Sequence, residues 1–240
     1  MTLDQPLRRI QTFVRRSSPL TSSQRQGMEE YAELFRILPG TCLDSITLFN
    51  NNHPLTVEIG FGMGQSLVAM AASAPERNFL GIEVHEPGLA QIFFDAGERQ
   101  LANLKILEGD ALELLSSYAP AGSVDRFQLY FPDPWPKKRH HKRRLVSAEN
   151  AELIRRKLRI GGIFHMATDW EDYAHWMLEV MSSAQGYRNL AGEGQFHPRP
   201  DYRPLTKFEQ RGLRDGHGIW DLLFETTSPL PNSHPTLIRR

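Results

Sequence analysis

From Leu55 onward the sequence alternates between short apolar runs of strand length and longer amphipathic runs of helix length. The expected strands are residues 55–59, 79–84, 104–107, 126–131, 162–168 and 219–225. The expected helices between them are 65–74, 87–99, a short helix ending at residue 115, 147–159 and 169–184. Strands that alternate with helices of this length indicate a parallel sheet with helices on both faces. We therefore expect an α/β fold with a mostly parallel central sheet and an antiparallel strand near the C-terminus.

The chain before this alternation differs in composition. Residues 1–52 are interpreted as a basic N-terminal extension, and residues 53–240 as the main domain. Apolar side chains at helical spacing over 28–38, closed by Pro39 and Gly40, predict a helix in the extension. Residues 43–49 are expected to form a short strand.

Composition excludes several classes of protein. Among 240 residues there is one cysteine, Cys42, so neither an intramolecular disulfide framework nor a cysteine-rich zinc site is expected. The N-terminus lacks the apolar core of a signal peptide, and no apolar run approaches the roughly 18 residues that would span a bilayer. We expect a cytoplasmic protein with no metal and no membrane contact. A monomer is expected because no long apolar stripe remains unassigned.

The charge is unevenly distributed, although 28 basic and 28 acidic side chains give a net charge of zero. Residues 137–159 hold ten basic and two acidic side chains, so this segment carries ten minus two, or +8. A second basic cluster near the N-terminus consists of Arg8, Arg9, Arg15, Arg16 and Arg25. Such clusters are either solvated faces or binding surfaces for a polyanion.

Carboxylates stand at or just past the ends of four successive expected strands: Glu58, Glu83, Asp110 and Asp133. The carboxyl ends of parallel strands meet at one edge of the sheet, where α/β proteins bind ligands. A turn with three glycines, Gly60, Gly62 and Gly64, follows the first strand and lets the backbone approach a ligand closely. We therefore expect a ligand site at this edge.

The site favours S-adenosylmethionine over a dinucleotide. The glycine spacing after Gly62 continues to Gln65 and departs from the dinucleotide fingerprint. A pyrophosphate would also be repelled by so many carboxylates, whereas a sulfonium with an amine and a ribose diol suits them. Glu83 is placed to accept hydrogen bonds from the ribose hydroxyls, and Asp110 from the adenine amine.

The stretch 131–144, FPDPWPKKRHHKRR, is the most informative part of the chain. Its prolines restrict the backbone on both sides of Asp133 and fix where that carboxylate points. The cations that follow are suited to phosphates and would draw RNA towards the site. Trp135 is suited to stack on a base, and equally to anchor the loop by packing.

This stretch resembles the signature of the bacterial tRNA (guanine-N7-)-methyltransferases. Supporting matches are Val57–Gly64, Gly81–His85, Ala167–Trp170, Thr206–Glu209 and Gly216–Leu222. The resemblance runs from about Arg8 to Glu225 and implies a Rossmann-like class I methyltransferase fold. It also implies methyl transfer from S-adenosylmethionine to N7 of the variable-loop guanine, position 46 of the tRNA. One departure is Ser18-Pro19, where family members usually carry Gly-Arg, which weakens the case for an N-terminal RNA contact.

The resemblance implies roles for particular residues. Contacts with the cofactor are implied for Glu58, Gly60, Gly62, Gly64, Glu83, Asp110 and Asp133. Asp133 is also implied to be catalytic. Contacts with the substrate are implied for Lys137, Asp169, Thr206, Lys207, Phe208 and Glu209. Contacts with RNA are implied for Arg139, His140, His141, Lys142, Arg143 and Arg144.

The chemistry of N7 methylation agrees with these roles. Guanine N7 has a lone pair in the neutral base, so alignment for in-line displacement matters more than proton removal. Asp133 is placed to stabilise the positive charge that develops on the ring, and Asp169 to fix the base. His165 and His175 are interpreted as ordinary fold residues. Residues 206–209 are either a surface crossover or a lid over the base.

Other classes of function remain open at this point. One is a different S-adenosylmethionine-dependent methyltransferase, acting on another RNA or on a small molecule. Another is an RNA-binding protein without catalytic activity, which would explain the basic segment but not the four strand-end carboxylates. An NAD-dependent oxidoreductase would need a different glycine pattern.

Overall fold

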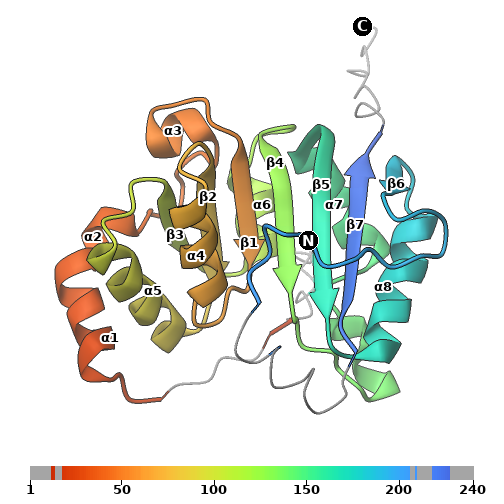
Figure 1. Cartoon of the computed structure of the whole chain (residues 1–240), viewed down its shortest axis with the longest axis horizontal. Coiled ribbons are helices and arrows are strands. Elements are labelled where there is room, and N and C mark those ends of the chain that lie inside the picture. Colours follow the sequence, from red (N-terminus) through yellow and green to blue (C-terminus); the bar gives the residue numbers. More distant parts are fainter. Residues whose placement is uncertain (1–11, 14–17, 206–208, 210–217, 228–240) are drawn as a thin grey trace, which may run out of the picture.

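The computed structural model describes residues 12–13, 18–205, 209 and 218–227. A seven-stranded sheet runs through the molecule in the order β3-β2-β1-β4-β5-β7-β6 (Figure 1). The strands are β1 Leu55–Ile59, β2 Asn78–Glu83, β3 Leu104–Glu108, β4 Val124–Tyr130, β5 Leu158–Thr168, β6 Tyr187–Asn189 and β7 Trp220–Thr226. β7 pairs antiparallel with both β5 and β6, whereas the other pairs are parallel. The predicted mostly parallel sheet with an antiparallel strand near the C-terminus is confirmed.

Helices cover both faces of the sheet. The main helices are α4 Gln65–Ser73, α5 Glu86–Glu98, α6 Ala111–Tyr118, α7 Ala148–Lys157 and α8 Glu171–Ser183. One apolar cluster joins α4 and α5 to the β2–β3 half of the sheet. The other packs α6, α7 and α8 against the opposite face. Figure 1 shows the segment that follows β6, drawn in blue, crossing β4, β5 and β7 on the face of the sheet where α4 covers the other strands.

The N-terminal extension packs onto the main domain. Its helical stretch consists of α1 Ser22–Gln26, the π turn η1 Gly27–Tyr31 and α2 Ala32–Phe35. A Cβ on Gly27 would lie 2.3 Å from the carbonyl oxygen of Ala90, so a glycine is needed where this stretch crosses α5. Ala32 and Phe35 belong to the same buried cluster as α4 and α5. The described part of the extension therefore shares its core with the rest of the chain.

One segment of the extension was predicted wrongly. Residues 43–49, expected as a strand, contain the helix α3 Ser45–Phe49. Asp44 caps the first turn by accepting a hydrogen bond from the Thr47 backbone N–H, and Asn50 ends the helix in the left-handed region. These end signals outweigh the apolar run. The short strand β6 was not predicted.

The described residues were compared with the requirements of a membrane-spanning helix and of a metal site. No helix there is long and apolar enough to cross a membrane. The same part of the chain holds no group of three or more histidine, cysteine, aspartate or glutamate side chains arranged to bind a metal.

Candidate functional site

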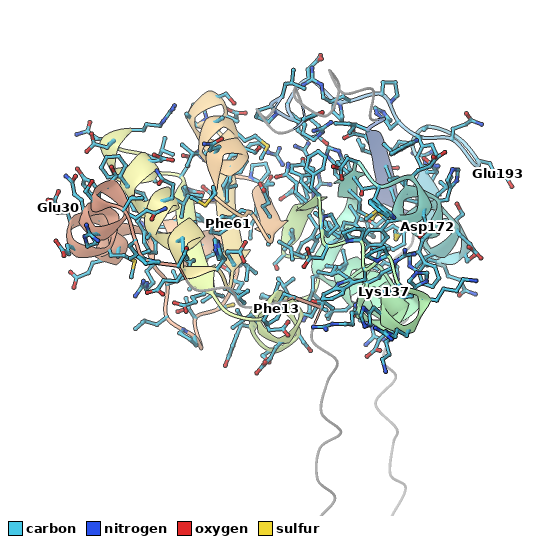
Figure 2. All side chains as sticks on the ribbon, turned by 90° about the horizontal axis from the view of Figure 1, so that it is seen from below. Phe13, Glu30, Phe61, Lys137, Asp172 and Glu193 are labelled. Carbon is cyan, nitrogen blue, oxygen red and sulfur yellow. The ribbon has the colours of Figure 1, made fainter. Side chains whose placement is uncertain are left out.

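A cavity of about 360 Å³ lies at the carboxyl edge of the sheet, where β1, β2, β3 and β4 end. Polar side chains at its wall include Glu83, Asp110 and Asp133, three of the four predicted carboxylates. Gly60, Gly62, Phe131, Thr12 and Phe13 also line it. Figure 2 shows Phe13 near the middle of the molecule in the view from below. The strand topology thus brings together residues that are far apart in the sequence.

The glycine turn after β1 needs its glycines. Gly60, Gly62 and Gly64 all have positive φ angles, of 71°, 59° and 77°. A Cβ on Gly64 would also lie 2.7 Å from Cδ1 of Ile92 in α5. The turn therefore packs tightly on α5, while its first two glycines have open space where a side chain would stand.

Backbone groups hold Glu83 at the end of β2. Its Oε2 accepts a hydrogen bond from the Gly62 N–H at 2.8 Å. Its Oε1 accepts from the N–H groups of Val84 at 2.7 Å and His85 at 3.2 Å. Three N–H donors fix the direction of the carboxylate, so the glycine turn and Glu83 form one rigid unit.

Asp110 has a similar local support at the end of β3. Its Oδ1 caps α6 by accepting from the Leu112 N–H at 3.0 Å, with a longer contact of 3.4 Å to the Glu113 N–H. The cap holds the carboxyl group at the cavity wall. The helix that begins here was predicted, and its cap is the residue expected to bind the ligand.

Glu58 lies in β1, just before the glycine turn, and does not line the cavity. Its side chain is buried, and its Oε2 has no hydrogen-bond partner among the described residues. Gln128 is its neighbour in the register of β1 and β4, and the buried Oε1 of Gln128 also lacks a described partner. Burial, with a smaller contribution from the charge of Glu83, raises the pKa of Glu58 to about 8. The carboxyl group is therefore mostly protonated at neutral pH.

Asp133 is exposed at the cavity wall in a constrained turn. Phe131 and Trp135, on either side of it, have positive φ angles of 49° and 46°, which non-glycine residues rarely adopt. Pro132 and Pro134 adjoin the carboxylate directly. The turn is therefore constrained by rare angles at Phe131 and Trp135, which differ from the extended backbone expected before a proline.

The basic segment after Asp133 forms the 3₁₀ turn η2 Lys138–Arg143. Lys137, Arg139 and Lys142 are exposed, and Figure 2 shows Lys137 on the half of the molecule that carries α7 and α8. His140 and His141 are partly buried. The predicted solvent-facing cations are thus present, next to the cavity in sequence.

Trp135 anchors the loop. The Arg143 guanidinium lies over its indole ring, 3.9 Å from the ring centre. The Trp135 Nε1–H donates to the carbonyl oxygen of Thr12 at 3.2 Å, and the Arg143 NH2 group donates to that of Phe13 at 3.3 Å. Trp135 and Arg143 therefore hold Thr12 and Phe13, the N-terminal pair that lines the cavity.

Arg144 does not lie on the surface, contrary to the expectation of an RNA contact. Its side chain is 1% exposed. It donates to the carbonyl oxygen of Pro134 at 3.0 Å, pairs with Asp172, and lies over the Tyr173 ring. A guanidinium enclosed in this way braces the Asp133 turn against α8 and is not open to a phosphate.

Of the predicted substrate residues, Asp169 lies half-exposed just past the end of β5. Thr206, Lys207 and Phe208 are outside the described residues, as are the N-terminal arginines Arg8, Arg9, Arg15 and Arg16. Glu209 is described, and its side chain is 2% exposed. It is paired with Arg203 inside the protein, which places it differently from a side chain that faces a substrate.

A buried polar network on β5 and β7 was missed by the sequence analysis. Arg203 bridges Glu209 and Asp221, and Asp221 contacts the fully buried His165. Burial lowers the pKa of His165 to about 4, so the imidazole is neutral at neutral pH. An aspartate inside the apolar strand 219–225 was the available signal, because a charge in such a position needs a partner.

Comparisons with known proteins agree with this fold and site. A family model described as "Putative methyltransferase" matches residues 52–222. The tRNA (guanine-N(7)-)-methyltransferase of Pseudomonas putida (strain W619) is 54% identical over 92% of each chain. The protein of the same name from Salmonella typhimurium (strain LT2) is 53% identical over 92% of each chain.

Solved structures with lower identity share the fold. The aminoglycoside resistance methyltransferase NpmB1 has a TM-score of 0.51 at 16% identity, over 88% of this chain and 95% of its own. The [4+2]-cyclase SpnF has a TM-score of 0.51 at 19% identity, over 86% of this chain and 81% of its own. Since one of these is a cyclase, the fold alone does not fix the reaction.

The topology, the glycine turn and the strand-end carboxylates define a Rossmann-like methyltransferase. The two relatives are 54% and 53% identical to this chain over 92% of each chain. The chain belongs to the family of tRNA (guanine-N7-)-methyltransferases.

Proposed function

We propose that this enzyme transfers the methyl group of S-adenosylmethionine to N7 of a guanine in tRNA, namely the variable-loop guanine at position 46. The observation that carries the proposal is the meeting of Glu83, Asp110 and Asp133 in one cavity whose next segment is the basic turn η2. A carboxylate-lined cavity suits a cationic cofactor, and the adjoining cations suit a polyanionic substrate. tRNA as the substrate also accords with a cytoplasmic enzyme.

The residues present fit the cofactor. Glu83, held by three backbone N–H groups, keeps lone pairs for the ribose hydroxyls, and Asp110 keeps Oδ2 for the adenine amine. The open space over Gly60 and Gly62 lets the backbone approach the methionine part. The cofactor contact predicted for Glu58 stays a prediction, because its buried side chain does not line the cavity. When bound, the cofactor supplies an electrophilic methyl group.

The side chains around the base would act through position and charge. N7 attacks with its own lone pair, so no general base is required. Asp133 stands in a rigid turn at the cavity wall, where its carboxylate would stabilise the positive charge developing on guanine and accept from N1–H and N2–H. Asp169, at the end of β5, would fix the base from the other side.

We assign tRNA contacts to those side chains predicted to contact the substrate or RNA in the basic segment that are at least partly exposed. These are Lys137, Arg139, His140, His141, Lys142 and Arg143, of which the three lysine and arginine residues 137, 139 and 142 are the most exposed. Arg144 is assigned a different task, because its contacts with Pro134 and Asp172 brace the turn that carries Asp133.

The proposal is tested by incubating the protein with labelled S-adenosylmethionine and unmodified tRNA. The digested tRNA should contain labelled 7-methylguanosine. A matched tRNA with adenine at position 46 should remain unlabelled. Label in another nucleoside, or in the control tRNA, would overturn the assignment of the site. Binding of tRNA without any label would indicate an RNA-binding protein instead.

A further inference from the structure

Trp170 exposes a large aromatic ring just past the end of β5. It is 43% exposed and has no ring contact, cation–π contact or side-chain hydrogen bond with any described residue. The other tryptophans are partly buried, and each contacts another ring: Trp135, Trp176 and Trp220. An indole carries one of the largest apolar surfaces of any side chain, so it gains free energy when a flat partner covers it.

The backbone holds Trp170 in place. Its N–H donates to the Thr168 hydroxyl at 3.2 Å. Its carbonyl oxygen accepts from the N–H groups of Tyr173 at 3.0 Å and Ala174 at 2.9 Å, two buried residues in the first turns of α8. The exposed ring therefore stands on a fixed backbone, and covering it costs little conformational entropy.

Trp170 lies beside the turn that carries Asp133. β4 and β5 are parallel neighbours, and Tyr130 at the end of β4 pairs with Ala167. The Phe131 N–H then donates to the Ala167 carbonyl oxygen at 2.8 Å. Asp133 follows Phe131 by two positions, and Trp170 follows Ala167 by three. The two chain segments thus leave the carboxyl edge of the sheet side by side.

The start of α8, which Trp170 precedes, also packs against the basic segment. Asp172 pairs with Arg144. The Trp176 ring lies 5.9 Å from the ring of His141 in η2, measured between ring centres. Figure 2 shows Asp172 and Lys137 on the same half of the molecule. A nucleic acid bound by the exposed cations of the basic segment would therefore pass the end of α8 where the indole is exposed.

An exposed aromatic ring at such a place suits a nucleic-acid base. Unpaired bases stack on aromatic side chains, and a base taken out of its own stack needs a replacement partner. Trp135 is less suited to this task, because the Arg143 guanidinium covers its ring and its Nε1–H is bound to Thr12.

The backbone of Trp170 is extended, with φ −107° and ψ 104°. Side chains of consecutive residues in an extended chain point to opposite sides. A base fixed by Asp169 is therefore a different base from one stacked on Trp170.

We propose that Trp170 stacks on an unpaired tRNA base next to the target guanine. The inference deepens the proposed function and rests on it. Stacking would hold the neighbouring nucleotide while the guanine enters the cavity beside Asp133. The free energy of this contact comes from the ring and not from charge, which separates Trp170 from the cations of the basic segment.

The test compares Trp170→Ala, Trp170→Leu and Trp170→Phe. The Kd for tRNA should rise by at least about fivefold in the alanine and leucine variants, the usual effect of losing one stacked base. Phenylalanine keeps an aromatic face and should restore the Kd to within about threefold of wild type. The slope of log Kd against log salt concentration should not change, because stacking neutralises no phosphate.

The matched control is Ile160→Ala, which removes another exposed apolar side chain of β5, at the opposite end of the strand. It should keep the wild-type Kd for tRNA. Calorimetry with S-adenosylmethionine should give the wild-type Kd for every variant and so report that the cavity is intact.

A second measurement identifies the stacked base. Two tRNAs are prepared, each lacking the base on one side of the target guanine. With one of them, wild type should lose affinity, and Trp170→Ala should lose no further affinity. Two changes that remove one contact are not additive, so this pattern shows that the indole and that base interact.

Wild-type tRNA affinity in Trp170→Ala would overturn the inference. A loss that phenylalanine does not restore, or that persists unchanged on both altered tRNAs, would show that the indole does not stack on a neighbouring base. An equal loss of cofactor affinity would assign Trp170 a structural role instead. A wild-type protein that binds tRNA and forms no 7-methylguanosine would overturn the proposed function, so the two failures are distinguishable.

Discussion

The carboxylates at the ends of β2 and β3 are held in place differently from the buried polar network that Arg203 forms with β5 and β7. Glu83 and Asp110 accept hydrogen bonds from backbone N–H groups within a few residues or from the adjacent glycine turn. His165, Arg203 and Asp221 hold one another through side chains, and His165 and Asp221 are 56 positions apart. One side of the site is preorganised by local backbone, the other by long-range pairing. A substitution should therefore affect only its own side, with Asp133 between them.

The largest effect should come from Asp133→Ala. We expect kcat to fall about 10²–10³-fold, the usual loss when one group that stabilises developing charge is removed. The Kd values for cofactor and tRNA should change only a few-fold, because neither supporting network is altered. Single-turnover kinetics with direct binding measurements would check this. Glu193→Ala removes an exposed acid far from Phe13 in Figure 2 and serves as the control. A large loss of tRNA affinity in Asp133→Ala, with turnover preserved, would contradict the role.

Stability should depend on pH with opposite sign on the two sides of the site. Glu58 has a folded pKa of about 8 against an ordinary value of 4.5, so its contribution to stability is present below about pH 4.5 and is lost as pH rises to 8. His165 has a lowered folded pKa of about 4, so its contribution is present above about pH 6.5 and is lost as pH falls towards 4.

The variant Glu58→Gln, which mimics the protonated group, isolates the first of these effects. As pH rises from 5 to 8, the free energy of unfolding of Glu58→Gln minus that of wild type should increase by about 1 kcal/mol per pH unit. Urea unfolding at several pH values measures the difference. A difference that is constant with pH would show that Glu58 is ionised in the folded protein.

The smallest effect should come from Lys142→Ala. Removing one exposed cation should weaken tRNA binding a few-fold and lower the slope of log Kd against log salt concentration by about 0.7–0.9. Cofactor affinity should be unchanged. Arg144→Gln is the matched comparison. Because Arg144 is buried, this substitution should lower the Tm and leave the salt slope as in wild type. Equal salt slopes for Lys142→Ala and wild type would show that Lys142 faces solvent and does not contact tRNA.

The local side of the site was predictable from sequence. A strand followed by a glycine turn or a capping acid can be recognised from a few consecutive residues. The sequence therefore predicts Gly62, Glu83 and Asp110 as site residues. The alternation of strands and helices gave the sheet for the same reason. The prediction of a strand at 43–49 was wrong because Asp44 caps a helix and Asn50 ends it, and these two residues decide the structure of the apolar run between them.

The long-range side was not predictable. Nothing next to Arg203 in the sequence indicates that it pairs with Asp221 of β7, and Arg144 has the same kind of side chain as its neighbours Lys142 and Arg143. Whether a cation faces water or the core depends on the register of the turn and on what α8 brings to it. A single sequence specifies these contacts only through the complete fold.

The strand order has a consequence for synthesis of the protein. β7 lies between β5 and β6, although it follows both in the chain. During translation β6 therefore has no strand to pair with until residues 220–226 leave the ribosome. The backbone groups on the β7 side of β5 also stay unpaired until then. Asp221 arrives with β7, so the buried network is assembled last. A nascent chain can complete early the side of the site that local backbone contacts hold, yet it gains the side held by long-range pairs only when β7 joins the sheet.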